Sequence, residues 1–146
     1  MFYDDFTIGD SYMTRGRTVT EADIVGFAGL SGDFNSLHVD AEYSKSTPFG
    51  QRIAHGLLVL SISSGLTVQT GLTSDSIIAF YGIDKLRFVK PVFIGDTLTV
   101  QNRVVELTPK EEPGRGLVVF ETTVLKQTGE LVLVYFRRVL LRRRAA

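Results

Sequence analysis

One long segment without charge precedes the most β-rich half of the chain, and this order constrains the fold more than any other feature. Residues 54–69 carry no charge except at His55 when it is protonated, and apolar residues occur nearly all round a helical projection. A helix of this kind is buried on most sides. The segment falls short of the roughly 20 apolar residues of a membrane span. The rest of the chain must therefore supply a surface that covers it.

From residue 76 onward the sequence changes from a helical to a partly alternating apolar pattern. Val, Ile, Leu, Phe, Tyr and Thr dominate there, as is typical of strands. Strands are predicted over residues 76–80, 85–89, 97–107, 117–126 and 130–141, with one more over 11–19. Gly95-Asp96, the Pro113–Gly116 stretch and Thr128-Gly129 are turn signals between them. Short connections favour antiparallel neighbours, so the sequence predicts an α+β fold with one helix against a meandering sheet.

The segment before the apolar helix predicts shorter helices. Thr20 is a hydroxyl N-cap followed by an acidic first turn and apolar residues at helical spacing, which predicts a helix over 21–30. Gly29 and Gly32 end this helix and begin a loop that reaches His38. Residues 40–43 predict another brief helical turn, which ends before Pro48.

Composition indicates a single domain over residues 1–146 and excludes several function classes. Of the residues, 44% are hydrophobic, and 16 basic side chains balance 16 acidic ones. No overall field therefore attracts nucleic acid or an acidic membrane. The absence of cysteine excludes disulfides and thiol nucleophiles.

The acidic start, residues 1–5, lacks the pattern of a secretory signal, so we expect a cytoplasmic protein. The arginines at 137–138 and 142–144 fit a solvated strand end and an anion site equally well.

Two short motifs carry the residues most suited to chemistry. Gly32-Asp33-Phe34-Asn35-Ser36-Leu37-His38 places a carboxylate and an imidazole five positions apart in a loop. Ala54-His55-Gly56 begins the apolar helix, where backbone N–H groups carry partial positive charge. A general acid, a general base and an anion stabiliser are the groups needed to add water to an activated carbon chain or to remove it. The motifs favour an enzyme.

Plainer interpretations of the same residues stand beside this one. Asp-x-Asn in a loop is often only an Asx-turn, and a lone His38 is often an ordinary hydrogen-bonded histidine. A metal site made of Asp33, His38 and His55 is conceivable in principle. Because the chain has no cysteine and no His-x-x-x-His spacing, we expect no metal.

In the order of these elements the chain resembles the MaoC-like dehydratases, the (R)-specific enoyl-CoA hydratases of the hot-dog fold. Their approximate signature, Gly-Asp-x-Asn-Pro-x-His, matches residues 32–38 except that Ser36 replaces the proline. Residues 53–58 resemble the start of the family's central helix, and residues 88–98 resemble its strand-turn element. The proline's loss frees the loop without removing either proton-transferring side chain.

The resemblance implies an antiparallel sheet wrapped around one long central helix, with a catalytic overhang segment. It also implies a hydro-lyase of fatty acid metabolism that hydrates trans-2-enoyl thioesters reversibly, with acyl-CoA as substrate and no cofactor. Asp33 and His38 would share the proton transfers, and the Gly56 N–H would be the oxyanion donor. Asn35, His55 and Ser61 are expected to support the loop or contact substrate. Phosphates of CoA need basic partners, for which the candidates are Arg52, Lys85, Arg87, Lys90 and the terminal arginines.

Two other functions and several details stay open at this stage. A hot-dog thioesterase is one alternative, although residues 56–69 lack the acidic residue that such enzymes place on or near the helix. A non-catalytic acyl-binding subunit is the other. Acyl chain length, CoA against acyl-carrier protein, and the group that protonates C2 are undetermined. Because little else would cover the sheet's edges and second face, we expect a homodimer at least.

Overall fold

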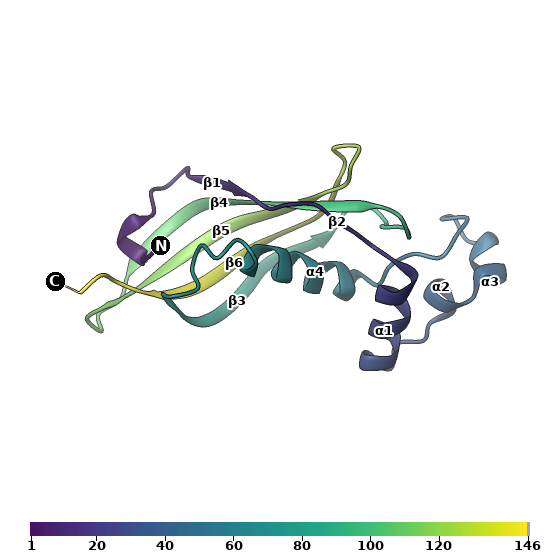
Figure 1. The fold of residues 1–146 in the computed structure, drawn as a ribbon, viewed down its shortest axis with the longest axis horizontal. Coiled ribbons are helices and arrows are strands. Elements are labelled where there is room, and N and C mark those ends of the chain that lie inside the picture. Colours follow the sequence, from purple (N-terminus) through teal and green to yellow (C-terminus); the bar gives the residue numbers. More distant parts are fainter. Residues whose placement is uncertain (146) are drawn as a thin grey trace.

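The computed structural model describes residues 1–145. A short 3-10 turn, four helices and six strands follow one another along the chain. Their bounds are η1 Tyr3–Asp5, β1 Ser11–Met13, β2 Arg17–Thr18, α1 Glu21–Ser31, α2 Ser36–Val39, α3 Ala41–Lys45, α4 Gly56–Val68, β3 Ile77–Phe88, β4 Thr97–Pro109, β5 Arg115–Leu125 and β6 Leu131–Arg142. The predicted α+β layout is confirmed: α4 lies along one face of a long sheet, and α1, α2 and α3 project beyond one end of it (Figure 1).

The sheet is antiparallel. Strands β4, β5 and β6 follow the predicted meander, but β3 pairs with β6 and not with its sequence neighbour β4. The main path of the sheet is β1-β4-β5-β6-β3, and β2 also pairs with β4. Tight turns join β4 to β5 and β5 to β6, and each pair of strands is paired along most of its length. Thr99↔Leu125 is at one end of the β4–β5 pairing, and Arg115↔Arg142 is at one end of the β5–β6 pairing. The strand β3 pairs with β6 and forms one edge of the path. That edge lies beside the long helix α4 (Figure 1).

Two strand predictions were wrong in their extent. The segments at 76–80 and 85–89 form the single strand β3, because register shifts near Phe80 and Asp84 absorb the residues that suggested a break. Lys85 takes a positive φ of 52° at the last of these irregularities. The predicted strand at 11–19 is two short strands, β1 and β2, both paired with β4.

The apolar helix forms as predicted but is covered on one side only within a single chain. Its inner face, with Leu58, Val59, Ile62 and Leu66, joins a core cluster with the strands, while Leu57 and Val68 are exposed. A second cluster extends the core under η1, where Tyr3 and Phe6 pack on β5 and β6 residues such as Phe120 and Val139. Neither α4 nor any other described helix is both long and apolar enough to cross a membrane.

The two ends of the molecule differ in character. Both termini lie at the end of the sheet away from α1, α2 and α3 (Figure 1). Arg143 pairs there with Asp4 at 2.7 Å, and Arg144 pairs with Asp5 at 2.8 Å. These two arginines of the basic tail therefore join the chain ends together. The opposite end carries the segment that contains the predicted Asp33–His38 motif.

Candidate active site

The segment that presents Asp33 is shaped by the end of α1. Thr20 caps this helix as predicted, accepting a hydrogen bond from the Asp23 N–H, while the Asp23 carboxylate accepts one from the Thr20 N–H. Gly32 ends α1 with a φ of 78°, a left-handed conformation that glycine adopts without strain. The chain therefore turns sharply just before Asp33.

Two side-chain turns follow and bring His38 into place. One Asp33 carboxylate oxygen, Oδ1, accepts the Asn35 N–H at 3.1 Å, and Asn35 Oδ1 accepts the Leu37 N–H at 3.0 Å. Asn35 thereby caps α2, a single helical turn that carries His38. The sequence predicted a loop through residue 38. The structure replaces its second half with this turn, because the Asn35 side chain satisfies a backbone donor that would otherwise be free.

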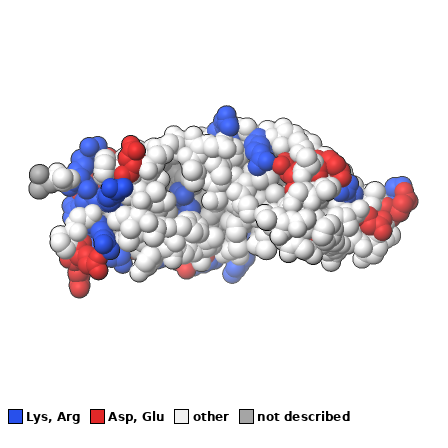
Figure 2. All heavy atoms as spheres, turned by 60° about the horizontal axis from the view of Figure 1, so that its bottom comes forward, with Lys and Arg blue, Asp and Glu red and all other residues white. Residues whose placement is uncertain are grey.

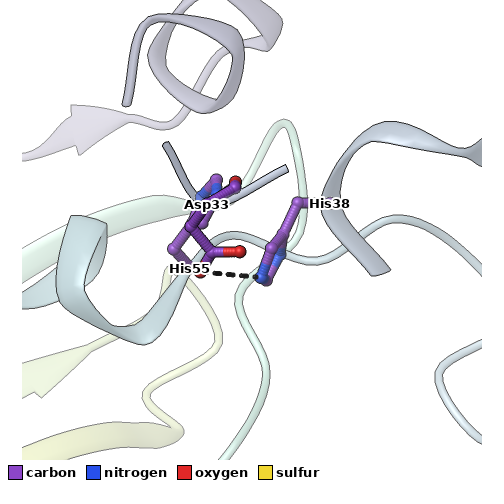
Figure 3. A group of neighbouring side chains, drawn as sticks. All are labelled: Asp33, His38 and His55. Carbon is purple, nitrogen blue, oxygen red and sulfur yellow. Dashed lines mark hydrogen bonds and ion pairs between the residues drawn. The ribbon is translucent and has the colours of Figure 1, made fainter. Parts of the chain in front are cut away.

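Asp33 and His38 face one another across a short gap (Figure 3). The His38 Nε2 lies 4.0 Å from Asp33 Oδ2, and His38 Nδ1 lies 2.7 Å from the Ile53 carbonyl oxygen. Because a carbonyl only accepts, Nδ1 carries the proton in the neutral ring and Nε2 presents a lone pair toward the carboxylate. The side chain of His38 is 10% exposed and that of Asp33 is 51% exposed. A gap of this width admits one water molecule that contacts both groups.

His55 lies directly against this pair. Its ring stacks on His38 with centroids 3.8 Å apart, and its Nε2 donates to the Asp33 backbone carbonyl at 2.9 Å. Phe27 of α1 covers another side of the His55 ring, edge on, at 4.9 Å. The two histidines and Asp33 thus form one group in which His55 contacts the other two residues (Figure 3).

Arg52 fixes the same segment from the other side. Its Nε donates to the His38 carbonyl, and its Nη1 donates to both carboxylate oxygens of Glu21 at 2.7 and 2.8 Å. Its side chain is only 16% exposed. The residue named above as a phosphate partner is therefore held in contacts within the chain, joining α1 to the turn that carries His38.

Gly56 begins α4 beside an apolar cavity. None of the described residues accepts a hydrogen bond from its N–H, as is usual for the first residues of a helix. A Cβ atom at position 56 would lie 2.7 Å from the Phe88 ring, so a larger residue there would require that ring to move. The cavity has a volume of about 470 Å³ and its lining includes Gly56, Leu57 and Phe88. Sequence reasoning placed Phe88 in the strand-turn element at residues 88–98 but missed it as a site residue, since nothing local shows that it meets Gly56.

The remaining candidates divide between the cavity and the outer surface. Lys90 lines the cavity and pairs with Glu130 at 2.7 Å. Lys85 lies over the Phe136 ring instead, and Arg87 donates to the neighbouring Leu86 carbonyl. Ser61 is exposed on α4, donates to the Leu57 carbonyl at 2.8 Å and is not among the residues that line this cavity.

The same three side chains form the described group closest to a metal-ligand set. One ligand atom from each of Asp33, His38 and His55 lies within 4.8 Å of the others. The imidazole planes are 27° apart and stacked, however, so their in-plane lone pairs run side by side and do not meet at one point. Ligands of a tetrahedral ion have to converge on it. The arrangement suits proton transfer better than metal binding.

Comparison with known proteins places this geometry in a family. The MaoC like domain model matches residues 5–128. The chain is 38% identical over 122 residues to an (R)-specific enoyl-CoA hydratase of Rhodospirillum rubrum, covering 84% of this chain and 79% of that protein. It is 40% identical over 111 residues to Protein MaoC of Klebsiella aerogenes, covering 76% of this chain but only 32% of that protein. The chain thus spans about a third of the length of the latter relative.

Solved structures agree with the sequence matches. An Archaeoglobus protein named as a monoamine oxidase regulatory protein superposes with a TM-score of 0.93 at 42% identity, covering 99% of this chain and 96% of that one. A Mycobacterium tuberculosis protein described as a double hot-dog fold gives a TM-score of 0.84 at 25% identity, covering 99% of this chain and 44% of that one. The predicted hot-dog fold is confirmed, and the names of the relatives confirm the predicted hydro-lyase class. The chain belongs to the MaoC-like dehydratase family.

Proposed function

We propose that this chain is an (R)-specific enoyl-CoA hydratase, equally a 3-hydroxyacyl-CoA dehydratase, that adds water reversibly and syn to a trans-2-enoyl thioester. The observation that carries the proposal is the pairing of Asp33 and His38, with His38 Nε2 at 4.0 Å from Asp33 Oδ2. The carboxylate is half exposed and can meet a substrate, while the imidazole is held by the Ile53 carbonyl. Relatives named as (R)-specific enoyl-CoA hydratases give the reaction its class.

In this mechanism one water molecule lies between Asp33 and His38. As its oxygen bonds to C3, one of the two side chains takes a proton from it, and the π electrons of the double bond move toward the thioester carbonyl. The same pair then delivers a proton to C2, so that water is added with no net change in the enzyme. General acid and base groups of this kind each contribute about 10² to 10⁴ in rate. The geometry is compatible with either residue as the final donor to C2.

Negative charge that gathers on the thioester oxygen needs a donor, and the Gly56 N–H fills that role in the proposal. It lies at the N-terminus of α4, where the helix dipole adds to the N–H group. One such donor is worth about 2.7–4 kcal/mol to the transition state. His55 directly precedes Gly56 and contacts both Asp33 and His38, so the donor follows a residue that packs against the acid–base pair.

In this proposal, the parts of the substrate next to its thioester occupy the cavity beside Gly56. Its lining is mostly apolar, with Ile53, Val59 and Val92 among the members, and Lys90 is the one basic residue there. Lys90 is therefore the preferred partner for a phosphate of CoA among the basic residues considered. The reaction as proposed requires no metal or redox cofactor, because proton transfers and a backbone donor suffice.

We further propose that the acting form is a homodimer that associates along β3. This strand is at one edge of the sheet path, so its outer backbone groups have no strand partner among the described residues. Five large apolar residues of β3 itself are exposed, namely Ile77, Ile78, Phe80, Tyr81 and Phe88. An exposed apolar edge strand is a template for pairing with another copy.

The test is an ultraviolet assay of crotonyl-CoA with the purified chain. Hydration removes the absorbance of the enoyl thioester without releasing free thiol, and a thiol reagent in a parallel sample measures the latter. In the reverse direction, dehydration of (R)-3-hydroxybutyryl-CoA should produce the absorbance of the enoyl thioester, and the (S) isomer should not react. Free thiol in proportion to the lost absorbance would show a thioesterase instead. No change with any of a panel of enoyl thioesters would contradict the proposal and favour a binding subunit.

A further inference from the structure

His55 is a buried histidine that contacts both members of the acid–base pair through groups that take no part in the proposed proton transfers. It is 2% exposed, and its ring stacks on the face of the His38 ring with centroids 3.8 Å apart. Its Nε2 donates to the main-chain carbonyl of Asp33 at 2.9 Å. Both contacts can be followed in Figure 3. His55 therefore leaves the Asp33 carboxylate and the His38 Nε2 free for chemistry.

The main chain of Asp33 depends on this contact for its position. Its other hydrogen bonds are local: its N–H donates to the Ser31 hydroxyl, and its carboxylate accepts the Asn35 N–H. Of the described residues outside 31–38, only His55 forms a hydrogen bond with Asp33. One hydrogen bond thus connects the half-exposed carboxylate to the segment that precedes α4.

The same segment also holds His38. The Ile53 carbonyl accepts from His38 Nδ1 at 2.7 Å, two residues before His55. This segment is in turn fixed to the rest of the chain, because the Ala54 N–H donates to the Val92 carbonyl at 2.7 Å. Residues 53 and 55 thus hold the imidazole and the carboxylate from one anchored segment. The gap between the two groups is set by that segment.

The two ring nitrogens of His55 differ in their surroundings. Because Nε2 donates to a carbonyl, the neutral ring carries its proton there. The other nitrogen, Nδ1, is buried and has no hydrogen-bond partner among the described residues. A proton on Nδ1 would be a buried donor without an acceptor, which is costly. The one polar atom of this ring that has a partner is therefore the atom that contacts Asp33.

We propose that His55 is a positioning residue, which sets the separation of Asp33 and His38 by holding the Asp33 main chain while its ring packs on His38. The inference rests on the proposed hydratase function, since that function gives the pair its reaction. His55 transfers no proton and acts through the pair, not on the substrate. Displacing a catalytic group by about 1 Å can cost about 10² in rate, so one such contact has a large effect.

The first experiment removes the hydrogen bond and keeps a ring. His55→Phe retains an aromatic face against His38 but has no donor for the Asp33 carbonyl. It should lower kcat on crotonyl-CoA by about 10- to 10²-fold with little change in KM, because the lost interaction matters in the transition state. His55→Gln places an amide N–H near the former Nε2 and should recover part of kcat. A wild-type kcat in folded His55→Phe would overturn the proposal.

Tyr135→Phe is the matched control. It too removes a hydroxyl or N–H group from a buried ring, since the Tyr135 hydroxyl contacts Ser63 of α4 at 2.9 Å. Its kcat should stay near that of the wild type. An equal loss in both variants would assign the effect to general loosening around α4 and overturn the proposal. Thermal unfolding shows which variants are folded, and His55→Met, which also lacks a donor, replaces His55→Phe if that variant is not.

A double-mutant cycle tests whether His55 acts through Asp33. In the Asp33→Asn background the separation of the pair has little left to control, so adding His55→Phe should lower the remaining turnover only slightly. Fully additive losses would show that His55 acts independently, for example on the substrate, and would overturn the positioning role.

Crystal structures of the wild type and His55→Phe separate this proposal from the one on which it rests. The distance from His38 Nε2 to Asp33 Oδ2 is 4.0 Å and should be longer in the variant. If the wild type hydrates no enoyl thioester while this distance grows in the variant, the hydratase falls and the positioning role stands. If the wild type is active and His55→Phe keeps both distance and kcat, the reverse holds. A lower kcat at an unchanged distance would also overturn the positioning role.

Discussion

Asp33 combines a structural and a chemical contact in one side chain. Its Oδ1 accepts the Asn35 N–H, which makes the Asx-turn that a bland interpretation of the motif expects. Its Oδ2 faces His38 Nε2 at 4.0 Å. The turn holds the carboxylate in one orientation, and preorganisation of this kind is what an acid–base pair requires. The Asx-turn and the proposed catalytic role are therefore compatible in one residue.

The first prediction at this scale concerns the acid–base pair. Asp33→Asn keeps the size of the side chain and an acceptor for the Asn35 N–H, but it cannot take a proton. His38→Gln likewise leaves a side chain of similar reach. Each should lower kcat on the preferred enoyl thioester by about 10² to 10⁴. Steady-state assays by absorbance measure this directly.

Asp40→Asn is the matched control for that experiment. Asp40 caps α3 by accepting the Tyr43 N–H at 2.9 Å, and asparagine caps helices about as well as aspartate. Its turnover should stay near that of the wild type. Near-normal turnover in folded Asp33→Asn or His38→Gln would remove that residue from the mechanism.

At the scale of elements, the turn before β4 is stabilised by a nearly buried carboxylate. Asp96 accepts the Phe93 N–H at 2.8 Å and the Gln127 side chain at 2.9 Å, and it pairs with Lys126 at 2.9 Å. Burial acts to raise the pKa of Asp96, but these hydrogen bonds and the ammonium group outweigh it and lower the pKa from its usual value. The turn signal Gly95-Asp96 thus also joins the start of β4 to the turn between β5 and β6.

A pH dependence follows from the direction of that shift. Because the pKa of Asp96 is lower in the folded chain, its contribution to stability is complete above the unfolded pKa and is lost as pH falls through the folded one. Asp96→Asn should therefore reduce the free energy of unfolding by about 1–3 kcal/mol near pH 7. The difference from wild type should shrink as the pH falls below the ordinary pKa of an aspartate.

Urea denaturation at several pH values measures this difference. Asp84→Asn is the control, since Asp84 forms an exposed pair with Arg138 and such pairs contribute little. A difference between Asp96→Asn and wild type that stays constant from neutral to acid pH would show that the charge of Asp96 is not what stabilises the turn.

At the scale of the whole molecule, the distribution of charge is uneven. Charged side chains gather toward the two ends of the face that bears α4 and β3, and its middle is mostly uncharged (Figure 2). Exposed apolar side chains lie on both of these elements: Leu57 and Val68 on α4, and the five apolar residues of β3 named above. A surface of this kind is typical of an interface between copies.

We expect the chain to sediment as a dimer of twice its 16.2 kDa mass. The double variant Ile78→Lys with Phe80→Lys places positive charges on β3, where two copies would meet, and should weaken the association roughly tenfold or more. Leu30→Lys is the control, because Leu30 is 85% exposed on α1 and outside that edge. A stable wild-type monomer in sedimentation equilibrium would contradict the dimer, as would a double variant that associates like the wild type.

Local patterns in the sequence were sufficient for much of the fold. Thr20 and Gly32 bound α1 within one residue of the prediction, and the charge-free segment forms α4 where expected. Caps, glycine turns and apolar periodicity act over a few residues, so one chain segment reveals them. The break predicted inside β3 was wrong because a strand's register shifts depend on its partner β6, which no local pattern contains.

The site divides in the same way between sequence and tertiary structure. The motif alone brought Asp33, Asn35 and His38 forward as candidates, since they lie within six consecutive residues. Only the folded chain stacks His55 on His38 and brings Phe88 against Gly56. These contacts join residues that are far apart in sequence, and their geometry is decided by how α4 packs on the sheet. Sequence determines which groups are present, whereas packing decides which of them meet.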